Sequence, residues 1–236
     1  MKILVGVNTL TSVDQLVYLS HCQFWTRTVK QYPNDEFMFF APHRMSIDNM
    51  RNASVKVALQ HNCDYLLFID DDVIVEPHTF KSLYECKLDI AMALTFIRGY
   101  PYDPMFFKFD EMKQNLKRVT DYKNLIGENG IIPCDAIGCS CVLFKTWLFK
   151  ETEEPWFLTC KNCTEDVYFC LQLHDKVKTP FTIGVDTKVP TSHKLSPEYI
   201  GALNRDALLT YNETLNPALE RNKKELAIKE TEKCPG

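Results

Sequence analysis

Three adjacent carboxylates follow an apolar stretch of this chain. Residues 65–69 carry no charge and no turn former, which predicts a strand buried on both faces, and the run ends at Asp70, Asp71 and Asp72. Neighbouring Asp side chains repel one another and are poor strand formers, so a cation would stabilise them. Hard oxygen ligands suit Mg²⁺ or Mn²⁺, which usually keep open positions for phosphates. The pattern favours a metal site over the alternative, an acidic turn that leaves the core.

The elements before this strand must position it. Hydrophobic periodicity predicts strands over residues 2–8 and 36–41 and helices over 13–31 and 48–61, with Thr and Ser of the polar turn at 8–12 able to cap the first helix. This βαβαβ order predicts a parallel sheet with right-handed crossovers. Ligands of such sheets bind outside the carboxyl ends of the strands. Residues 8–11, the loop after Ala41 and the three Asp all fall at that edge.

The rest of the chain continues the α/β pattern. We expect strands over 89–96, 131–136, 139–144 and 181–185, a meander over 105–119, and helices over 77–86, 146–152 and 164–173. Thr164 is a good N-cap, and Glu165 and Asp166 suit the positive end of the last of these helices. Residues 197–236 are charged and predict a helical extension, which would cover the acceptor side or form a homodimer contact.

Composition limits the class of protein. The 236 residues are 45% hydrophobic, which suits one large α/β domain or a core domain with an appendage. The 27 basic and 31 acidic side chains include no basic block, so there is no clear nucleic-acid footprint. No stretch approaches the ~20 apolar residues of a transmembrane segment.

The ten cysteines indicate the redox environment. They are scattered and follow no recognisable signal peptide, so we expect reduced thiols and a cytoplasmic protein, in the host cytoplasm if the source is viral. The pair Cys160-x-x-Cys163 lacks the second pair that a structural zinc site needs.

Several motifs in order carry a resemblance. They are Arg51-Asn52-Ala53 on a helix, the strand ending in Asp70 and Asp72, a small-residue segment around Gly138, Trp156 followed by Glu165-Asp166, and a late strand and loop reaching His193. Over about residues 40–194 the chain resembles the GT-A glycosyltransferases, family-2-like. The family often has glycine where Thr164 stands, and the segment around Gly138 is richer in cysteine here, which leaves the shape of the sugar pocket open.

The resemblance implies a fold and a domain organisation. The fold would be a GT-A-type, Rossmann-like open sheet, mainly parallel and flanked by helices. Residues 1–196 would form the catalytic domain, with a nucleotide-binding half over about 1–96 and an acceptor half over about 97–196. The helical extension would follow over 197–236.

The resemblance also implies an activity. It would be a metal-dependent, hexosyltransferase-type transfer of a sugar from a nucleotide-diphosphate sugar, with UDP favoured, to the hydroxyl of an unidentified acceptor such as a glycan. A Mn²⁺ (or Mg²⁺) ion on Asp72 and His193 would stabilise the leaving diphosphate as a Lewis acid. Asp70 would contact the metal through water or the ribose, and Asp71 is an open alternative for either role.

The remaining roles follow from chemistry at the expected positions. Asp166 would be the general base, which predicts inversion at the anomeric carbon, and Glu165 would orient it or the acceptor. Arg51 would pair with phosphate or stack on the base, and Trp156 would stack on an acceptor sugar; a solvated helix Arg and core packing are the alternatives. We expect the nucleotide and donor to contact Asn8, Thr9, Arg51, Asp70, Asp71 and Gly138.

Other classes fit part of the pattern. A haloacid-dehalogenase-like phosphatase also places DxD after an apolar strand, but normally on the first strand of its fold. A sugar nucleotidyltransferase would need a glycine-rich loop after the first strand, and residues 8–11 contain no glycine. A non-catalytic sugar- or nucleotide-binding module has no use for Asp166 as a base.

Overall fold

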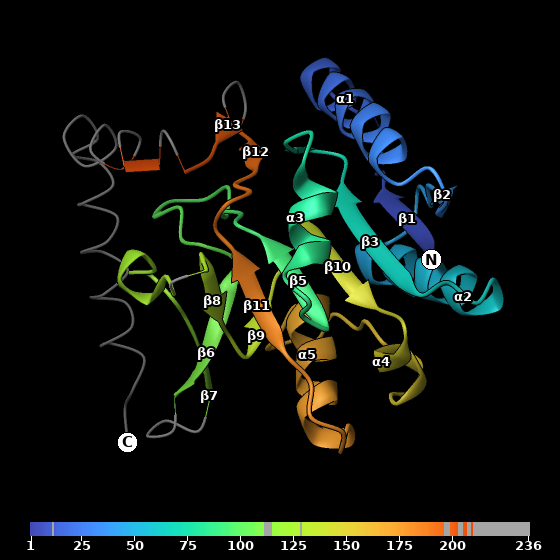
Figure 1. Ribbon diagram of the computed structural model, residues 1–236. Helices are drawn as coiled ribbons and strands as arrows, with labels where there is room; N and C mark the ends of the chain where they lie inside the picture. The colour runs from blue at the N-terminus through green and yellow to red at the C-terminus, as the bar shows by residue number, and fades with distance from the viewer. Residues whose placement is uncertain are drawn as a thin grey trace, which may run out of the picture.

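The computed structural model is a mixed α/β fold (Figure 1). It describes residues 1–10, 12–110, 115–127, 129–195, 199–202, 205–206 and 209. Its central sheet has seven strands in the order β2-β1-β3-β10-β5-β11-β8. The expected α/β fold class, a mainly parallel sheet flanked by helices, is therefore confirmed.

The first half of the sheet is built from the expected βαβαβ unit. Strands β1 (Lys2–Asn8), β2 (Glu36–Phe40) and β3 (Tyr65–Asp70) are parallel and are joined by α1 (Gln15–Gln31) and α2 (Ile47–Gln60). Asp14, rather than a Thr or Ser, caps α1 by accepting a hydrogen bond from the Leu16 amide. The register pairs Asn8 with Asp70, so both side chains reach the carboxyl edge together.

The second half continues the same sheet. Strand β10 (Cys141–Lys145) runs antiparallel between β3 and β5 (Ile90–Ala93), β11 (Ile183–Asp186) is parallel to β5, and β8 (Ile131–Pro133) closes the edge antiparallel to β11. Strands β5 and β11 thus point the same way as β1–β3. The expected nucleotide and acceptor halves share one continuous sheet.

Two small sheets and four short helices complete the described chain. One sheet contains β4 (Val73–Ile74), β12 (Ser192–Lys194) and β13 (Tyr199–Ile200), and the other contains β6 (Phe106–Asp110), β7 (Asn115–Arg118) and β9 (Ala136–Ile137). The helices are α3 (Thr79–Glu85), η1 (Lys123–Leu125), α4 (Trp147–Lys150) and α5 (Glu165–Lys176). None of the helices within the described ranges is long and apolar enough to cross a membrane.

The helical extension expected over 197–236 is wrong at its start. Tyr199–Ile200 form strand β13, because their backbone pairs with His193 and Lys194 of β12. Most of the remaining extension, including all of residues 210–236, lies outside the described residues. The expected dimer contact through that segment stays a prediction.

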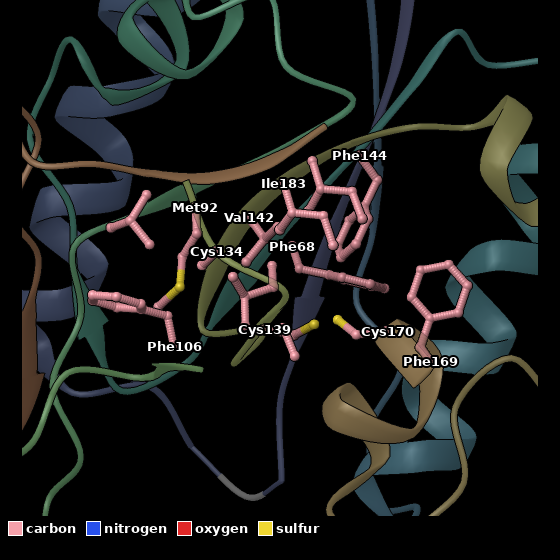
Figure 2. Close-up of a cluster of buried hydrophobic side chains, with 14 of the residues drawn as sticks. Phe68, Met92, Phe106, Cys134, Cys139, Val142, Phe144, Phe169, Cys170 and Ile183 are labelled. Carbon is pink, nitrogen blue, oxygen red and sulfur yellow. The ribbon is translucent and has the colours of Figure 1, made fainter. Parts of the chain in front are cut away.

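Two apolar layers cover the sheet, as alternating side chains on β3 require. Leu67 and Ile69 face the α1 and α3 side, whereas Leu66 and Phe68 face the layer that contains α5. Figure 2 shows this second layer, in which thiols such as Cys139 and Cys170 lie among aromatic and aliphatic side chains. These cysteines behave as small apolar residues. All nine cysteines of the described ranges are free thiols.

Phe68 links this core to the edge where the carboxylates lie. Its ring is fully buried, lies 5.8 Å from the Phe144 ring and 5.7 Å from the Phe157 ring, and supports the Arg51 guanidinium at 5.1 Å. We predict that Phe68→Ala lowers the free energy of unfolding by about 3–5 kcal/mol, because a large cavity would remain. Urea denaturation measures this loss.

The matched control is Phe109→Ala, since Phe109 is 50% exposed. Its substitution should change the free energy of unfolding by no more than about 0.5 kcal/mol. Equal losses in the two variants would show that the Phe68 layer is not the core that supports the edge.

Candidate active site

A cavity of about 700 Å³ opens at the carboxyl edge of β1 and β3. The structure brings most of the predicted site residues together in its lining. These are Asn8, Arg51, Asp70, Asp71, Asp72, Glu165, Asp166 and His193. They come from five separate segments of the chain, so the fold assembles a site that no single motif contains.

Arg51 is the centre of this assembly. It projects from α2 and is only 3% exposed. Its Nε donates to Glu165 Oε1 at 3.0 Å, its Nη1 to the Cys139 carbonyl at 3.0 Å, and its Nη2 to the two Asp70 oxygens at 3.4 and 3.3 Å. The guanidinium therefore joins α2, β3, the β9–β10 connection and α5. The alternative of a solvated helix Arg is wrong.

Burial makes these charges strongly interdependent. It raises the pKa of both the Asp70 and the Glu165 carboxyl groups, and the positive charge of Arg51 opposes each shift. Burial also disfavours the charged form of Arg51, but the surrounding carboxylates hold its pKa above the usual value. Asn8 adds a hydrogen bond from Nδ2 to Asp70 Oδ1 at 3.3 Å, while its own buried Oδ1 has no hydrogen-bond partner among the described residues.

The three adjacent Asp residues have different surroundings. Asp70 faces Arg51, whereas Asp71 Oδ2 accepts a hydrogen bond from the Leu10 amide at 3.0 Å and so fastens the loop after β1. Burial raises the pKa of Asp71, and the charges of Asp72 and Asp70 add to the shift. Asp72 is the member of the triplet whose carboxylate meets an imidazole.

His193 lies beside Asp72 because β12 pairs with β4. This pairing sets His193 opposite Val73, and the Lys194 amide donates to the Asp72 carbonyl at 2.9 Å. His193 Nδ1 lies 2.9 Å from the Phe96 carbonyl, which directs a proton on Nδ1 to that oxygen, and Nε2 lies 3.2 Å from Asp72 Oδ1. Burial opposes ionisation of Asp72, but His193 and Arg98 hold its pKa below the usual value.

The carboxylate and imidazole groups of the cavity determine how a divalent cation could be held. No group of three or more His, Cys, Asp or Glu within the described ranges is arranged to hold a metal ion. Asp72 Oδ1 and His193 Nε2 nevertheless form a mixed oxygen and imidazole pair at the cavity wall. Two protein ligands fit an ion whose other positions are filled by substrate phosphates and water. The residues therefore fit a substrate-completed site and not a closed protein cage.

The start of α5 contributes two carboxylates to the cavity lining. Glu165 is held by Arg51 as described, and Asp166 Oδ1 accepts hydrogen bonds from Thr164 Oγ1 and from the Val167 amide at 2.8 Å. Within the described ranges Asp166 Oδ2 has no hydrogen-bond partner. Asp166 thus offers one carboxylate oxygen while the other fixes its orientation, an arrangement suited to accepting a proton.

Gly138 lies just behind this carboxylate. A Cβ built on Gly138 would come within 2.6 Å of Met105 Cε and 3.4 Å of Asp166 Oδ2. Met105 lines the cavity and its sulfur accepts a hydrogen bond from Ser140 Oγ at 3.2 Å, so the small-residue segment does form part of the wall. A side chain at position 138 would displace the Met105 side chain.

Three predicted residues, Gly138, Thr9 and Trp156, do not line the cavity. Thr9 instead joins two loops through its main chain, since its amide donates to the Pro42 carbonyl at 3.2 Å. Trp156 is buried, its Nε1 donates to the Phe149 carbonyl at 2.9 Å, and its ring packs edge-on against Phe149. The acceptor role expected for Trp156 is therefore corrected to core packing, because its polar atom and its ring are both engaged within the core.

Sequence reasoning missed two cations of the lining. Arg98, 60% exposed, donates from Nη1 to Asp72 Oδ2 at 2.8 Å, and Lys194 Nζ donates to Asp14 Oδ2 at 2.7 Å. Arg98 lies in a loop of glycine and prolines whose path the sequence does not specify. Lys194 follows His193 directly in the sequence. The segment that was predicted to bring His193 to the site therefore also indicated that Lys194 would lie there.

Comparisons with known proteins concern the fold. No family model matches this chain, and no curated protein matches it. The crystal structure of A197 from STIV is similar with a TM-score of 0.55 and 16% identity, over 83% of this chain and 86% of that one. Likeness at this identity shows a shared fold alone. The resemblance to GT-A glycosyltransferases stays a prediction.

Two further solved structures are more distant. HddC from Yersinia pseudotuberculosis has a TM-score of 0.42 and 7% identity, over 80% of this chain and 92% of that one. The 4-diphosphocytidyl-2C-methyl-D-erythritolsynthase from Anaerococcus prevotii DSM 20548 has a TM-score of 0.45 and 10% identity, over 90% and 99% of the two chains. Neither likeness bears on the chemistry of this chain.

Removal of the Arg51 charge should lower the stability of the fold, and the size of the loss should depend on pH. We predict that Arg51→Met lowers the free energy of unfolding by about 3–5 kcal/mol near pH 8, because Asp70 and Glu165 would be buried without their partner. Their folded-state pKa values would rise further above the unfolded values, so the folded variant would bind protons that the unfolded chain releases. The loss should therefore be smaller at pH 5.5 than at pH 8 in urea denaturation.

Arg27→Met is the matched control, because Arg27 is exposed on α1. Its effect should stay within about 0.5 kcal/mol and should not vary with pH. A pH-independent loss in Arg51→Met would contradict the assigned charge network.

Proposed function

We propose that this chain is a metal-dependent glycosyltransferase that moves a sugar from a nucleotide-diphosphate sugar, with UDP favoured, to an acceptor hydroxyl with inversion. One observation carries the proposal. The Asp72–His193 pair and an oriented Asp166 lie in the lining of the same cavity, at the sheet edge where α/β folds bind ligands. The first is suited to a diphosphate-bound cation and the second to an acceptor proton.

Mn²⁺, or Mg²⁺, would be held by Asp72 and His193. When bound, the cation would supply Lewis-acid stabilisation of the negative charge that develops on the leaving diphosphate. Imidazole together with carboxylate favours Mn²⁺ over Mg²⁺. Asp71 is bound to the Leu10 amide, so Asp72 is the better assignment within the triplet.

The residues of the chain divide the remaining work. Arg51 is fully engaged by protein groups, so its role is to hold Asp70 and Glu165 in place and not to contact phosphate directly. Arg98 is the cation most able to turn towards a diphosphate, because its side chain is 60% exposed. The buried Asn8 Oδ1 in the same lining is suited to accepting a hydrogen bond from an N–H or O–H group of the nucleotide.

Asp166 would take the proton of the acceptor hydroxyl as that oxygen forms the new glycosidic bond. Thr164 Oγ1 and the Val167 amide fix Oδ1, and Oδ2 would receive the proton. Attack from the side opposite the departing diphosphate inverts the anomeric carbon. Glu165, held by Arg51, would orient the acceptor side of the cavity without changing its own protonation.

The phosphatase alternative fits the geometry less well. It requires an Asp of the DxD motif as a free nucleophile, but both Asp70 oxygens accept from Arg51 Nη2, and β3 follows two complete βα units. A binding module without catalysis is separated from the proposal by the reaction itself. Release of nucleotide from a panel of nucleotide-diphosphate sugars with Mn²⁺ present tests for turnover through slow donor hydrolysis, with no acceptor required.

Nucleotide binding should depend on the cation through Asp72. We predict that UDP with Mn²⁺ raises the melting temperature of the wild type by roughly 5–10 °C at a hundredfold excess over Kd, and that UDP alone has a much smaller effect. Asp72→Asn keeps the shape and the acceptor for Arg98 but removes the anionic ligand, so the Mn²⁺-dependent part of the shift should disappear. Differential scanning fluorimetry measures the shift.

Asp71→Asn is the matched control for the same triplet. It should keep the Mn²⁺-dependent shift, because Asp71 accepts from the Leu10 amide whereas His193 pairs with Asp72. A shift that survives in Asp72→Asn and disappears in Asp71→Asn would transfer the metal role to Asp71.

Catalysis should be separable from binding at Asp166. Asp166→Asn retains an oxygen for Thr164 Oγ1 and the Val167 amide, so we predict unchanged Mn²⁺-dependent UDP binding together with a 10²–10⁴-fold loss of transfer rate. The rate is measured with the donor identified by the hydrolysis panel and an acceptor found by screening. Asp175→Asn, on an exposed position of the same helix, is the control and should transfer at the wild-type rate. Wild-type transfer by Asp166→Asn would exclude Asp166 as the base.

A further inference from the structure

Cys160 and Cys163 differ from most cysteines of the described chain. Cys63, Cys134, Cys139, Cys141 and Cys170 are buried, whereas Cys160 is exposed and Cys163 is partly exposed. They occupy the loop between Phe157 and α5, and the candidate active site uses neither thiol. An accessible pair with this spacing is the arrangement in which cysteine reactivity, more than packing, decides the role.

The backbone holds the two cysteines side by side. The Cys160 amide donates to the Cys163 carbonyl at 3.0 Å. This bond brings the main chains of the two residues together, and a disulfide between them would need Cα atoms about 4.4–6.8 Å apart. Burial raises the pKa of Cys163, and the charge and hydrogen bond of the neighbouring Cys160 thiol add to the shift.

Both ends of this loop are fastened to the rest of the site. Asn52 of α2 exchanges two hydrogen bonds with the Phe157 backbone, at 2.7 and 3.0 Å, and the Thr159 amide donates to Asp48. At the other end Cys163 is followed directly by Thr164, whose hydroxyl donates to Asp166. A covalent link between residues 160 and 163 would therefore close a ring next to the cap of α5.

A metal does not explain the pair. Within the described ranges no group of three or more His, Cys, Asp or Glu is arranged to hold a metal ion, and two thiols alone do not complete a zinc site. The loop also forms part of the wall of a second cavity of about 720 Å³, so small molecules can reach it. Thiol–disulfide chemistry is the remaining reaction that this geometry favours.

We propose that Cys160 and Cys163 form a reversible redox site that undergoes exchange with a low-molecular-weight disulfide. One thiolate attacks the disulfide, which gives a mixed disulfide and releases one small thiol. The second thiolate then attacks the protein sulfur of that intermediate, forming the Cys160–Cys163 bond and releasing the second thiol. Two protein thiols are oxidised and one small disulfide is reduced to two thiols. This proposal does not depend on the proposed sugar transfer.

Glutathione disulfide is the probe, and peptide mapping is the measurement. The full-length protein is incubated with the probe, alkylated, denatured and digested with trypsin. Cleavage after Lys161 separates Cys160 from Cys163, so their disulfide would join peptides 151–161 and 162–176. We expect this joined species in the wild type, lighter by two hydrogen atoms than the sum of the separate peptides, and its disappearance after dithiothreitol.

Variants separate the assigned pair from other cysteines. Peptide 162–176 also contains the buried Cys170, so Cys163→Ser should abolish the joined species and leave glutathione on Cys160. Cys22→Ser removes an exposed cysteine elsewhere and should leave the joined species unchanged. The proposal is overturned if the wild type carries glutathione on both cysteines without joining, if the joined species survives in Cys163→Ser, or if Cys22 reacts while Cys160 and Cys163 do not.

Discussion

The placement of one buried guanidinium determines the geometry of the whole sheet edge. Arg51 lies between Asp70 on β3 and Glu165 on α5, with the Cys139 carbonyl as a third acceptor and the Phe68 ring beneath it. Removing one partner from such a network leaves an unpaired buried charge, which is far more costly than the net gain from forming the pair. Segments distant in sequence are thereby fixed to one another at the point where ligand chemistry is expected.

Local patterns in the sequence were sufficient to predict the alternating first half of the fold. The apolar run before Asp70 and the periodicity of the first two helices specify β3, α1 and α2, and the parallel order then puts Asn8 and Asp70 at one edge. Long-range pairing was not readable in this way. The insertion of β10 antiparallel between β3 and β5, and the strand at Tyr199–Ile200, depend on partners far along the chain. Backbone pairing overrode the helical pattern at residue 199.

The distinction between local sequence patterns and long-range pairing also applies to the candidate active site. The types of Asp70, Asp166 and His193 indicated chemistry, and the fold brings them into one cavity. The charged partners of these residues could not be predicted. Nothing in the local sequence distinguishes an arginine that becomes buried, such as Arg51, from one that stays exposed, such as Arg98. Trp156 shows the opposite error, because a residue that packs in the core was predicted to bind ligand. Its position next to a functional motif is not decisive, since an indole N–H can find a hydrogen-bond acceptor in the core as well as at a surface.

The charge of the cavity lining favours the proposed cation. Its lining contains six carboxylates, from Asp14, Asp70, Asp71, Asp72, Glu165 and Asp166, against the three cations Arg51, Arg98 and Lys194. Each of those cations is already paired with a carboxylate. A diphosphate entering such a site would meet net negative charge in a partly desolvated space, where repulsion is screened far less than in water. A divalent ion between Asp72 and the phosphates would reverse that repulsion and would leave Arg98 free to turn from Asp72 to the ligand.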